Sequence, residues 1–309
     1  MTEAADSMLS LMIPVEITDT VLHSTTVAET DYSAWSNGTT YSIGNKVIRG
    51  HRIYESAQNS NLNKDPTDIN NRTGSTIWWI DVSATNAHKM FDNESTSATV
   101  AATSLTVVLR PGFISGLYAG GLVGDTATIT VKDSPGGTTV YSATIQLENS
   151  YRGDYWEYFF APFSQQRDLV IDDIPPYYNC EVTFTLSISS GNVECGMFQV
   201  GEIRPVGVLQ YGGSVRPKSY SAIKEDEFGN VEVRKRRKAR DATYQVIIDK
   251  TLGNGAMDAL TSVLDVPTVV IATTFDDYSW LRTFGLVSSD MSPDNYSENV
   301  INITVKGMV

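Results

Sequence analysis

Short runs in which β-branched and polar residues alternate recur along this chain, and they constrain its fold more than any other feature. The most regular of these runs cover residues 105–109, 127–131, 140–145 and 181–188. Alternation with a period of two places successive side chains on opposite faces of a sheet. Between two of the runs, residues 134–137 read Ser-Pro-Gly-Gly, the composition of a hairpin turn. The chain is therefore predicted to be mainly β.

The character of the sequence changes along its 309 residues, which leave room for two or three domains. We expect an N-terminal arm or strand at 1–30, a small three-stranded module at 31–82, a jelly-roll-like β-sandwich at 83–202 and a β-rich assembly domain at 203–309. One helix is expected over 256–264, where apolar residues recur at helical spacing. The last part is thus predicted to be α+β, with a mostly antiparallel sheet.

The apolar run at residues 8–13 stands in a segment that carries Glu3 and Asp6, which is unlike the basic start of a secretory signal. We interpret this run as a terminal arm or a first strand laid on a neighbour. No stretch of the chain reaches about 18 consecutive apolar residues, the length that a membrane-spanning helix needs. Membrane insertion is therefore not expected.

The chain is acidic, with 36 Asp and Glu against 23 Lys and Arg. Because nucleic acid is bound mainly through Lys and Arg, it is not an expected partner. One basic run departs from this balance and contains Arg234, Lys235, Arg236, Arg237, Lys238 and Arg240. We interpret it as an interface for an acidic neighbour, including an adjacent copy of the chain. A solvated loop and a nucleic-acid contact are the alternatives, and the acidic segment 224–227 is a candidate partner.

Aromatic residues are concentrated between residues 32 and 80, a segment too small to build a core without them. The segment contains, in order, Ala34-Trp35, Tyr41, Gly44, Val47, Tyr54, Pro66 and Trp78. This order resembles the small chitin- and cellulose-binding modules of chitinases, although Arg52 departs from their pattern. The resemblance implies that sugar faces stack on Trp35, Tyr54, Trp78 and Trp79. The alternative is that Trp35 and one of the Trp78–Trp79 pair form the core of the module.

The next segment carries the patterns Asn86…Lys89-Met90-Phe91-Asp92 and Arg167-Asp168-Leu169-Val170-Ile171. Together they resemble galactose-binding-like jelly rolls, in which ligands are bound by loops at one end of the sandwich. By that resemblance, the loop residues that could line a site are Asn86, His88, Lys89 and Asp92. The commoner interpretation is structural, with Met90 and Phe91 anchored in the core while Asn86 and Asp92 bond to backbone groups.

The C-terminal part carries a further pattern, formed by Tyr211-Gly212, Asp226, Phe228-Gly229-Asn230, Lys235-Arg236 and Val246. With the two preceding segments, it makes residues 32–309 resemble bacteriophage tail proteins. The resemblance implies a structural subunit of the tail, neck or baseplate, located in the virion and assembled in the host cytoplasm. Its partners would be other tail proteins and itself, with host glycan as a further contact. The alternative is an adhesion protein that binds host cell-surface carbohydrate.

No catalytic, metal or cofactor site is predicted. The histidines His23, His51 and His88 lie in separate regions, and Cys180 and Cys195 are expected to be free thiols. The carboxylate pairs at 172–173 and 276–277 are poor candidates for a glycosidase pair, because adjacent acids on a strand point to opposite faces. They are interpreted as loop or turn residues or as weak calcium contacts. The chain is thus expected to be a non-enzymatic protein without a cofactor.

Overall fold

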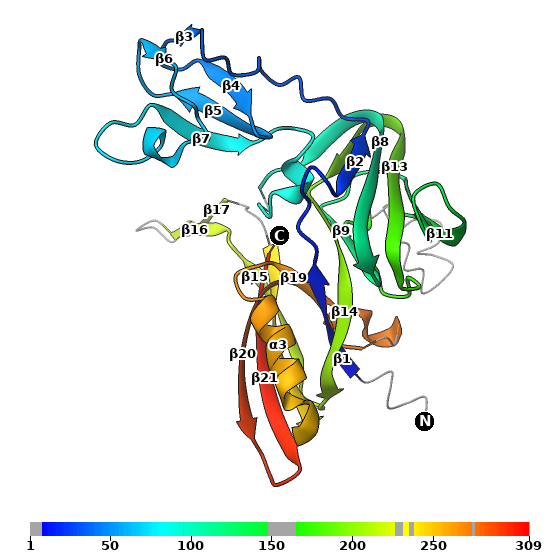
Figure 1. Ribbon diagram of the computed structural model, residues 1–309. Coiled ribbons are helices and arrows are strands. Elements are labelled where there is room, and N and C mark those ends of the chain that lie inside the picture. The colour runs from blue at the N-terminus through cyan, green and yellow to red at the C-terminus, as the bar shows by residue number, and fades with distance from the viewer. Residues whose placement is uncertain are drawn as a thin grey trace.

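The computed structural model describes residues 8–94, 96–147, 165–225, 231–234, 238–273 and 276–308 (Figure 1). Strands in antiparallel sheets make up most of it, and these residues include one α-helix, α3 (Gly253–Ser262). The predicted fold class, mainly β with an antiparallel α+β region towards the C-terminus, is confirmed. Among the helices of the described ranges, none has the length and hydropathy of a membrane span.

The small module forms one end of the molecule (Figure 1). Its three-stranded sheet contains β4 (Lys46–Arg49), β5 (Arg52–Ser56) and β7 (Trp79–Ala84). A second pair is formed by β3 (Thr40–Tyr41) and β6 (Asn61–Leu62), and the short 3-10 helix η1 (Ile69–Asn71) precedes β7. Such short strands bury little aliphatic surface, so the core is mostly aromatic and consists of Tyr41, Val47, Tyr54 and Trp79.

Two layers of strands form the sandwich. One layer has the order β11-β10-β13-β8-β2 and contains β2 (Leu22–Thr25), β8 (Thr99–Ile114), β10 (Thr126–Lys132), β11 (Thr139–Gln146) and β13 (Tyr177–Cys195). The other contains β9 (Gly116–Gly120), β12 (Leu169–Ile171) and the first part of β14 (Met197–Leu209). In β10, Ala127, Ile129 and Val131 are all buried, as the alternation predicts. The 3-10 helix η2 (Lys89–Phe91) adds the fully buried Met90 to the same core.

Six strands close into a ring, and five of them come from the C-terminal half of the chain while β1 comes from its N-terminal end. Their order is β14-β1-β19-β20-β21-β18, and β18 pairs again with β14. The strands not yet introduced are β1 (Met8–Pro14), β18 (Lys238–Asp249), β19 (Thr268–Ile271), β20 (Thr283–Pro293) and β21 (Glu298–Gly307). Helix α3 follows the 3-10 helix η3 (Lys250–Leu252) and contributes Ala256 and Leu260 to the core of the ring. A further 3-10 helix, η4 (Asp276–Leu281), precedes β20.

The apolar N-terminal run is an interior strand of the chain's own sheet. Strand β1 pairs with β14 on one edge and with β19 on the other, and its residues Leu9 and Leu11 are fully buried. Both neighbours lie far along the sequence, so periodicity alone does not reveal them. Of the two interpretations of this run, the first strand agrees with the structure, and the neighbours on which it lies are strands of the same chain, whose pairing satisfies its backbone groups.

Strand β14 belongs to both large parts of the molecule. Residues 197–201 pair with β9, and residues 201–208 pair with β1. The expected boundary between residues 202 and 203 therefore lies inside one continuous strand. Gly201 stands where the pairing changes, and a Cβ atom there would overlap the backbone carbonyl of Ile13. The sandwich and the C-terminal sheet are thus joined through a shared strand that passes closely over β1.

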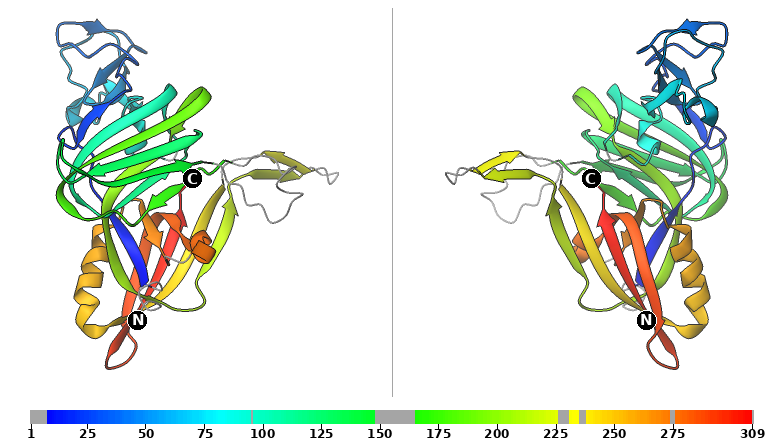
Figure 2. Two further views of the ribbon diagram at one scale, coloured as in Figure 1. Left: turned by 90° about the vertical axis from the view of Figure 1, so that its right-hand side faces the viewer. Right: turned by 90° about the vertical axis from the view of Figure 1, so that its left-hand side faces the viewer.

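A two-stranded hairpin projects from the C-terminal sheet, as both views of Figure 2 show. It consists of β16 (Ala222–Glu225) and β17 (Val231–Arg234), which pair antiparallel. The hairpin follows β15 (Ser214–Ser219), the edge strand that pairs with β18. The basic run predicted from the sequence therefore spans the junction between this hairpin and the sheet.

Candidate functional site

Two of the four predicted sugar-stacking residues lie in the core of the module. Trp79 is fully buried, and its ring meets the Tyr41 ring edge-on with the centroids 5.3 Å apart. Its Nε1 donates a hydrogen bond of 2.7 Å to the carbonyl of Lys64. Tyr54 is only 3% exposed. Neither ring has a free face for a sugar, so the expectation is corrected for Tyr54 and Trp79, which the minimal module needs for its own core.

Trp35 and Trp78 are half-buried and pack against the outside of that core. Each ring lies close to a cation of the module. The guanidinium carbon of Arg49 is 5.0 Å from the centroid of Trp35, and Nζ of Lys64 is 5.3 Å from the centroid of Trp78. These distances allow cation–π attraction, which places a charge where a sugar would stack. The two tryptophans therefore keep partly covered faces at the surface of the module.

Three residues of the basic run, Arg234, Lys238 and Arg240, lie within the described part of the chain. Arg234 ends β17 and pairs with Glu232 at 2.9 Å, and both side chains are more than half exposed. Lys238 and Arg240 are exposed on β18, beside the edge strand β15. Outside the described residues lie Lys235, Arg236 and Arg237, together with Asp226 and Glu227 of the acidic segment. The basic side chains that are described thus lie where the hairpin leaves the sheet.

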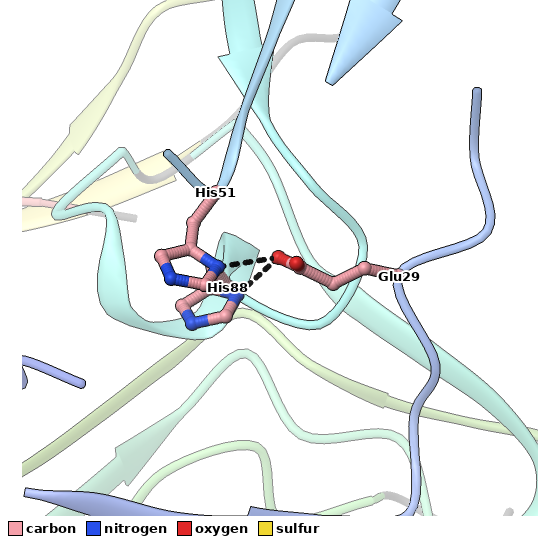
Figure 3. Close-up of side chains that lie close together, drawn as sticks. All are labelled: Glu29, His51 and His88. Carbon is pink, nitrogen blue, oxygen red and sulfur yellow. Dashed lines mark hydrogen bonds and ion pairs between the residues drawn. The ribbon is translucent and has the colours of Figure 1, made fainter. Parts of the chain in front are cut away.

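The loop before β8 has a structural role, which the sequence favoured over a ligand site. Met90 is fully buried, and the side chain of Asn86 exchanges hydrogen bonds of 2.8 and 2.9 Å with the backbone of Val100. Asp92 accepts a hydrogen bond of 2.8 Å from the backbone of Glu94. His88 is the exception in this loop, because its ring points towards side chains from other parts of the chain (Figure 3).

Glu29, His51 and His88 form a cluster that the sequence interpretation missed (Figure 3). The Nδ1 atoms of both imidazoles lie 2.8 Å from the same oxygen, Oε1 of Glu29. The two rings stack with their centroids 4.0 Å apart. The prediction that the histidines lie apart is therefore wrong for His51 and His88.

Each member of this cluster comes from a different part of the fold. Glu29 lies between β2 and the module, His51 lies in the turn between β4 and β5, and His88 directly precedes η2 of the sandwich. His51 adopts a left-handed backbone conformation with a φ of 61°, which is uncommon for a residue other than glycine. Its carbonyl accepts a hydrogen bond of 2.9 Å from the amide of Thr85. No local spacing in the sequence connects the three residues.

Two further side chains hold the cluster in place. The hydroxyl of Thr85 donates a hydrogen bond of 2.6 Å to Oε1 of Glu29. On the other side, Oδ1 of Asp19 lies 2.9 Å from Nε2 of His51. The imidazole of His51 is thus held at both nitrogens by carboxylates, which fixes the orientation of its ring.

The electrostatics of the cluster follow from these contacts. Burial, the largest influence, would raise the pKa of Glu29, but the hydrogen bonds from Thr85 and His51 and the charge of the imidazoles lower it. Burial would lower the pKa of His51, but its hydrogen bond to Glu29 and the charges of Glu29 and Asp19 raise it. The pKa of His88 is lowered by burial and by the charge of His51. Folding therefore favours an ionised Glu29 beside a protonated His51 and a neutral His88.

The chemistry of the donor atoms suits a metal ion. Two imidazole nitrogens and a carboxylate oxygen lie within 4.8 Å of one another. Nitrogen and oxygen donors of this kind bind zinc and other divalent transition metals. Across the described ranges, this is the group of His, Cys, Asp and Glu side chains that is gathered closely enough to hold such an ion.

No family model matches the chain, and no curated protein matches it. Among solved structures, it is similar to a mutant of chitosan-binding module 1, derived from a chitosanase/glucanase of Paenibacillus sp. IK-5. The two are 12% identical with a TM-score of 0.25, and the match covers 37% of this chain and 82% of that chain. A likeness of this size is too small to assign a shared fold or a shared ligand.

Proposed function

We propose that this chain is a structural component of a bacteriophage tail, a tail, neck or baseplate subunit that assembles with copies of itself through its projecting hairpin. In this proposal the protein is located in the virion and is assembled in the host cytoplasm. Support comes from the resemblance of residues 32–309 to phage tail proteins and from one structural observation. The hairpin β16–β17 stands away from the body (Figure 2), although a two-stranded hairpin by itself is marginally stable in water.

The hairpin exposes apolar side chains. Val231 and Val233 on β17 are 58% and 53% exposed. Residues two apart on a strand lie on the same face, so these two valines form one small apolar surface. Exposed β-branched side chains on a projecting strand favour contact with another protein. A partner that covers this face would also stabilise the pairing of β16 with β17.

The charge of the chain indicates what kind of partner fits. Residues 216–240, here called the basic arm, hold nine Lys or Arg and four Asp or Glu, a net charge of +5. Since the whole chain carries −13, the remaining residues carry −18. A basic arm on an acidic body is complementary to the body of a second copy. Contacts of this head-to-tail kind generate rings when their rotation closes, which suits a tail subunit.

Light scattering of the purified chain over a range of concentrations tests this proposal. We expect a discrete oligomer such as a trimer, hexamer or dodecamer. The double variant Lys238→Glu and Arg240→Glu should shift the mass towards the monomer, because it reverses two exposed charges of the basic arm. The control is Arg204→Glu with Lys250→Glu, which changes the net charge equally at exposed positions outside the arm. A monomer at every concentration, or an oligomer that arm reversal leaves intact, would overturn the proposal.

Glycan binding by the small module is the second candidate function. It is favoured by the partly exposed rings of Trp35 and Trp78 at the module surface, and a stacked sugar would have to displace Arg49 and Lys64 from those rings. A glycan array tests it with the wild type, Trp35→Ala and Trp78→Ala. Loss of a bound glycan in both variants supports the candidate, provided that Tyr296→Ala, a control at an aromatic residue that is 91% exposed, binds normally. Absence of any bound glycan removes it.

A further inference from the structure

We propose that Glu29, His51 and His88 bind a divalent transition-metal cation, with Zn²⁺ as the representative ion, and that the bound cation fastens the small module to the β-sandwich. The site lies apart from the basic arm, so its occupancy can be tested whether or not the chain assembles.

The first support is that two imidazole nitrogens meet the same carboxylate oxygen. Nδ1 of His51 and Nδ1 of His88 both face Oε1 of Glu29, each at 2.8 Å (Figure 3). Zinc ligands at about 2.0–2.1 Å in tetrahedral geometry are about 3.3–3.4 Å from one another. Each of these contacts therefore has to open by only about half an ångström to admit the ion.

The second support is an outer shell of the kind that metal-bound histidine requires. When Nδ1 of His51 is a ligand, its Nε2 carries the proton, and Oδ1 of Asp19 lies 2.9 Å away to accept it. A carboxylate in that position fixes the ring and strengthens the imidazole as a ligand. Thr85 plays the corresponding part for the carboxylate, because its hydroxyl donates a hydrogen bond of 2.6 Å to Glu29.

The third support is the accessibility of the cluster. The side chains of His51, Glu29 and His88 are 38%, 28% and 17% exposed. An ion can therefore reach the site from solvent while the surrounding chain excludes part of the water. Three protein ligands leave a fourth tetrahedral position for a water molecule. Binding requires Nδ1 of each imidazole to be free of its proton, so the metal competes with protons for these nitrogens.

The location of the ligands determines what the cation would do. His51 belongs to the module, His88 to the sandwich and Glu29 to the segment that connects β2 with the module. Without a metal, the three side chains are joined by hydrogen bonds and by the stacking of the two imidazoles, and hydrogen bonds of this kind contribute modestly to stability in water. A cation that bonds to all three segments at once would restrict the orientation of the module relative to the sandwich.

Isothermal titration of the metal-stripped full chain with ZnCl₂ tests the site. We expect one Zn²⁺ per chain, with binding at least tenfold weaker in Glu29→Gln, His51→Asn and His88→Gln. Asparagine is chosen at position 51 because it tolerates the left-handed backbone found there. The control is His23→Gln, since His23 is exposed and lies outside the cluster. Circular dichroism verifies that each variant is folded.

Two further measurements keep the proposal testable if a ligand variant fails to fold. The visible absorption of Co²⁺ added to the wild-type chain should show a tetrahedral nitrogen–oxygen site, and Zn²⁺ should abolish it by displacement. Spin labels on the module and on the sandwich should give a narrower distance distribution with Zn²⁺ than without it. Absence of saturable binding, or binding that all three ligand variants retain, would overturn the site. If Zn²⁺ binds but the distance distribution between module and sandwich stays unchanged, the cation does not restrict the orientation of the module, and that part of the proposal is overturned.

Discussion

Arg110 and Glu181 face each other across neighbouring strands of the sandwich, with Nη2 of the arginine 2.9 Å from Oε2 of the glutamate. On the other side, Nζ of Lys132 on β10 lies 3.3 Å from Oε1. The Glu181 side chain is only 8% exposed, so a carboxylate is held between two cations at the surface of the sheet. This arrangement makes the sandwich sensitive to acid.

Glu181→Gln should therefore weaken the dependence of stability on pH. Burial, the largest influence, would raise the pKa of Glu181, but hydrogen bonds from Arg110 and Lys132 outweigh it and lower the pKa. A carboxyl with a lowered folded pKa stabilises the fold above its unfolded value of about 4.3, and this contribution is lost as pH falls through the folded pKa. At pH 7 we expect the variant to lose about 1–2 kcal/mol of unfolding free energy, since both cations remain partly exposed.

Urea denaturation at pH 7 and at pH 3 measures this effect. The matched control is Glu202→Gln, whose partner Arg204 is 47% exposed, and it should behave like the wild type at both pH values. An equal loss of stability on acidification in Glu181→Gln and the wild type would contradict the prediction.

Trp78 and Trp79 should respond very differently to truncation, although they are adjacent. Trp79→Ala removes a fully buried ring and a hydrogen bond to Lys64, and such changes cost about 3–5 kcal/mol. Trp78→Ala removes a half-buried ring and should cost about 1 kcal/mol or less. Hydrogen exchange of the β4–β5–β7 amides, followed by mass spectrometry, separates the two. Comparable loss of protection in both variants would show that Trp79 is not the centre of the module core.

Two glycine-to-alanine substitutions should shift the melting temperature in opposite directions. Gly201→Ala places a methyl group against the backbone carbonyl of Ile13, where β14 and β1 are paired and cannot move apart freely. We expect a loss of about 1–3 kcal/mol. Gly255 lies in α3, and an added Cβ would meet no atom within 4 Å apart from its chain neighbours and nearby helix backbone, so Gly255→Ala should stabilise by about 0.5–1 kcal/mol. Calorimetry of both variants measures the shifts, and two shifts of the same sign would refute this account.

Both thiols should be inert in the folded protein. Cys195 is fully buried, and burial raises its pKa to about 12. Burial likewise raises the pKa of Cys180 to about 11. Because only the thiolate reacts, a disulfide reagent at pH 8 should modify neither cysteine until the protein unfolds. Release of chromophore from the native chain within minutes would contradict this prediction, and denaturation by guanidinium should expose two reactive thiols.

Local chemistry in the sequence determined the secondary structure of much of this protein. The alternation at residues 127–131 predicts β10, whose apolar residues are the buried ones. The helical spacing at 256–264 predicts α3, which spans Gly253–Ser262. Both depend on periodicity within a few residues, and a single strand or helix turn carries that information. The aromatic content of the module likewise indicates a core made of rings, but the sequence does not say which rings are buried.

The tertiary structure alone decided which distant segments meet. The pairing of β1 with both β14 and β19 depends on strands near residues 200 and 270, so the pattern of residues 8–13 could not reveal it. The burial of Trp79 rather than Trp78 depends on which of these two adjacent side chains turns towards Tyr41. Glu29, His51 and His88 come from a connecting segment, a turn and a loop, where no periodicity exists to link them. Side chains in such segments come together only after the sheets have packed, because strand pairing positions the loops between them.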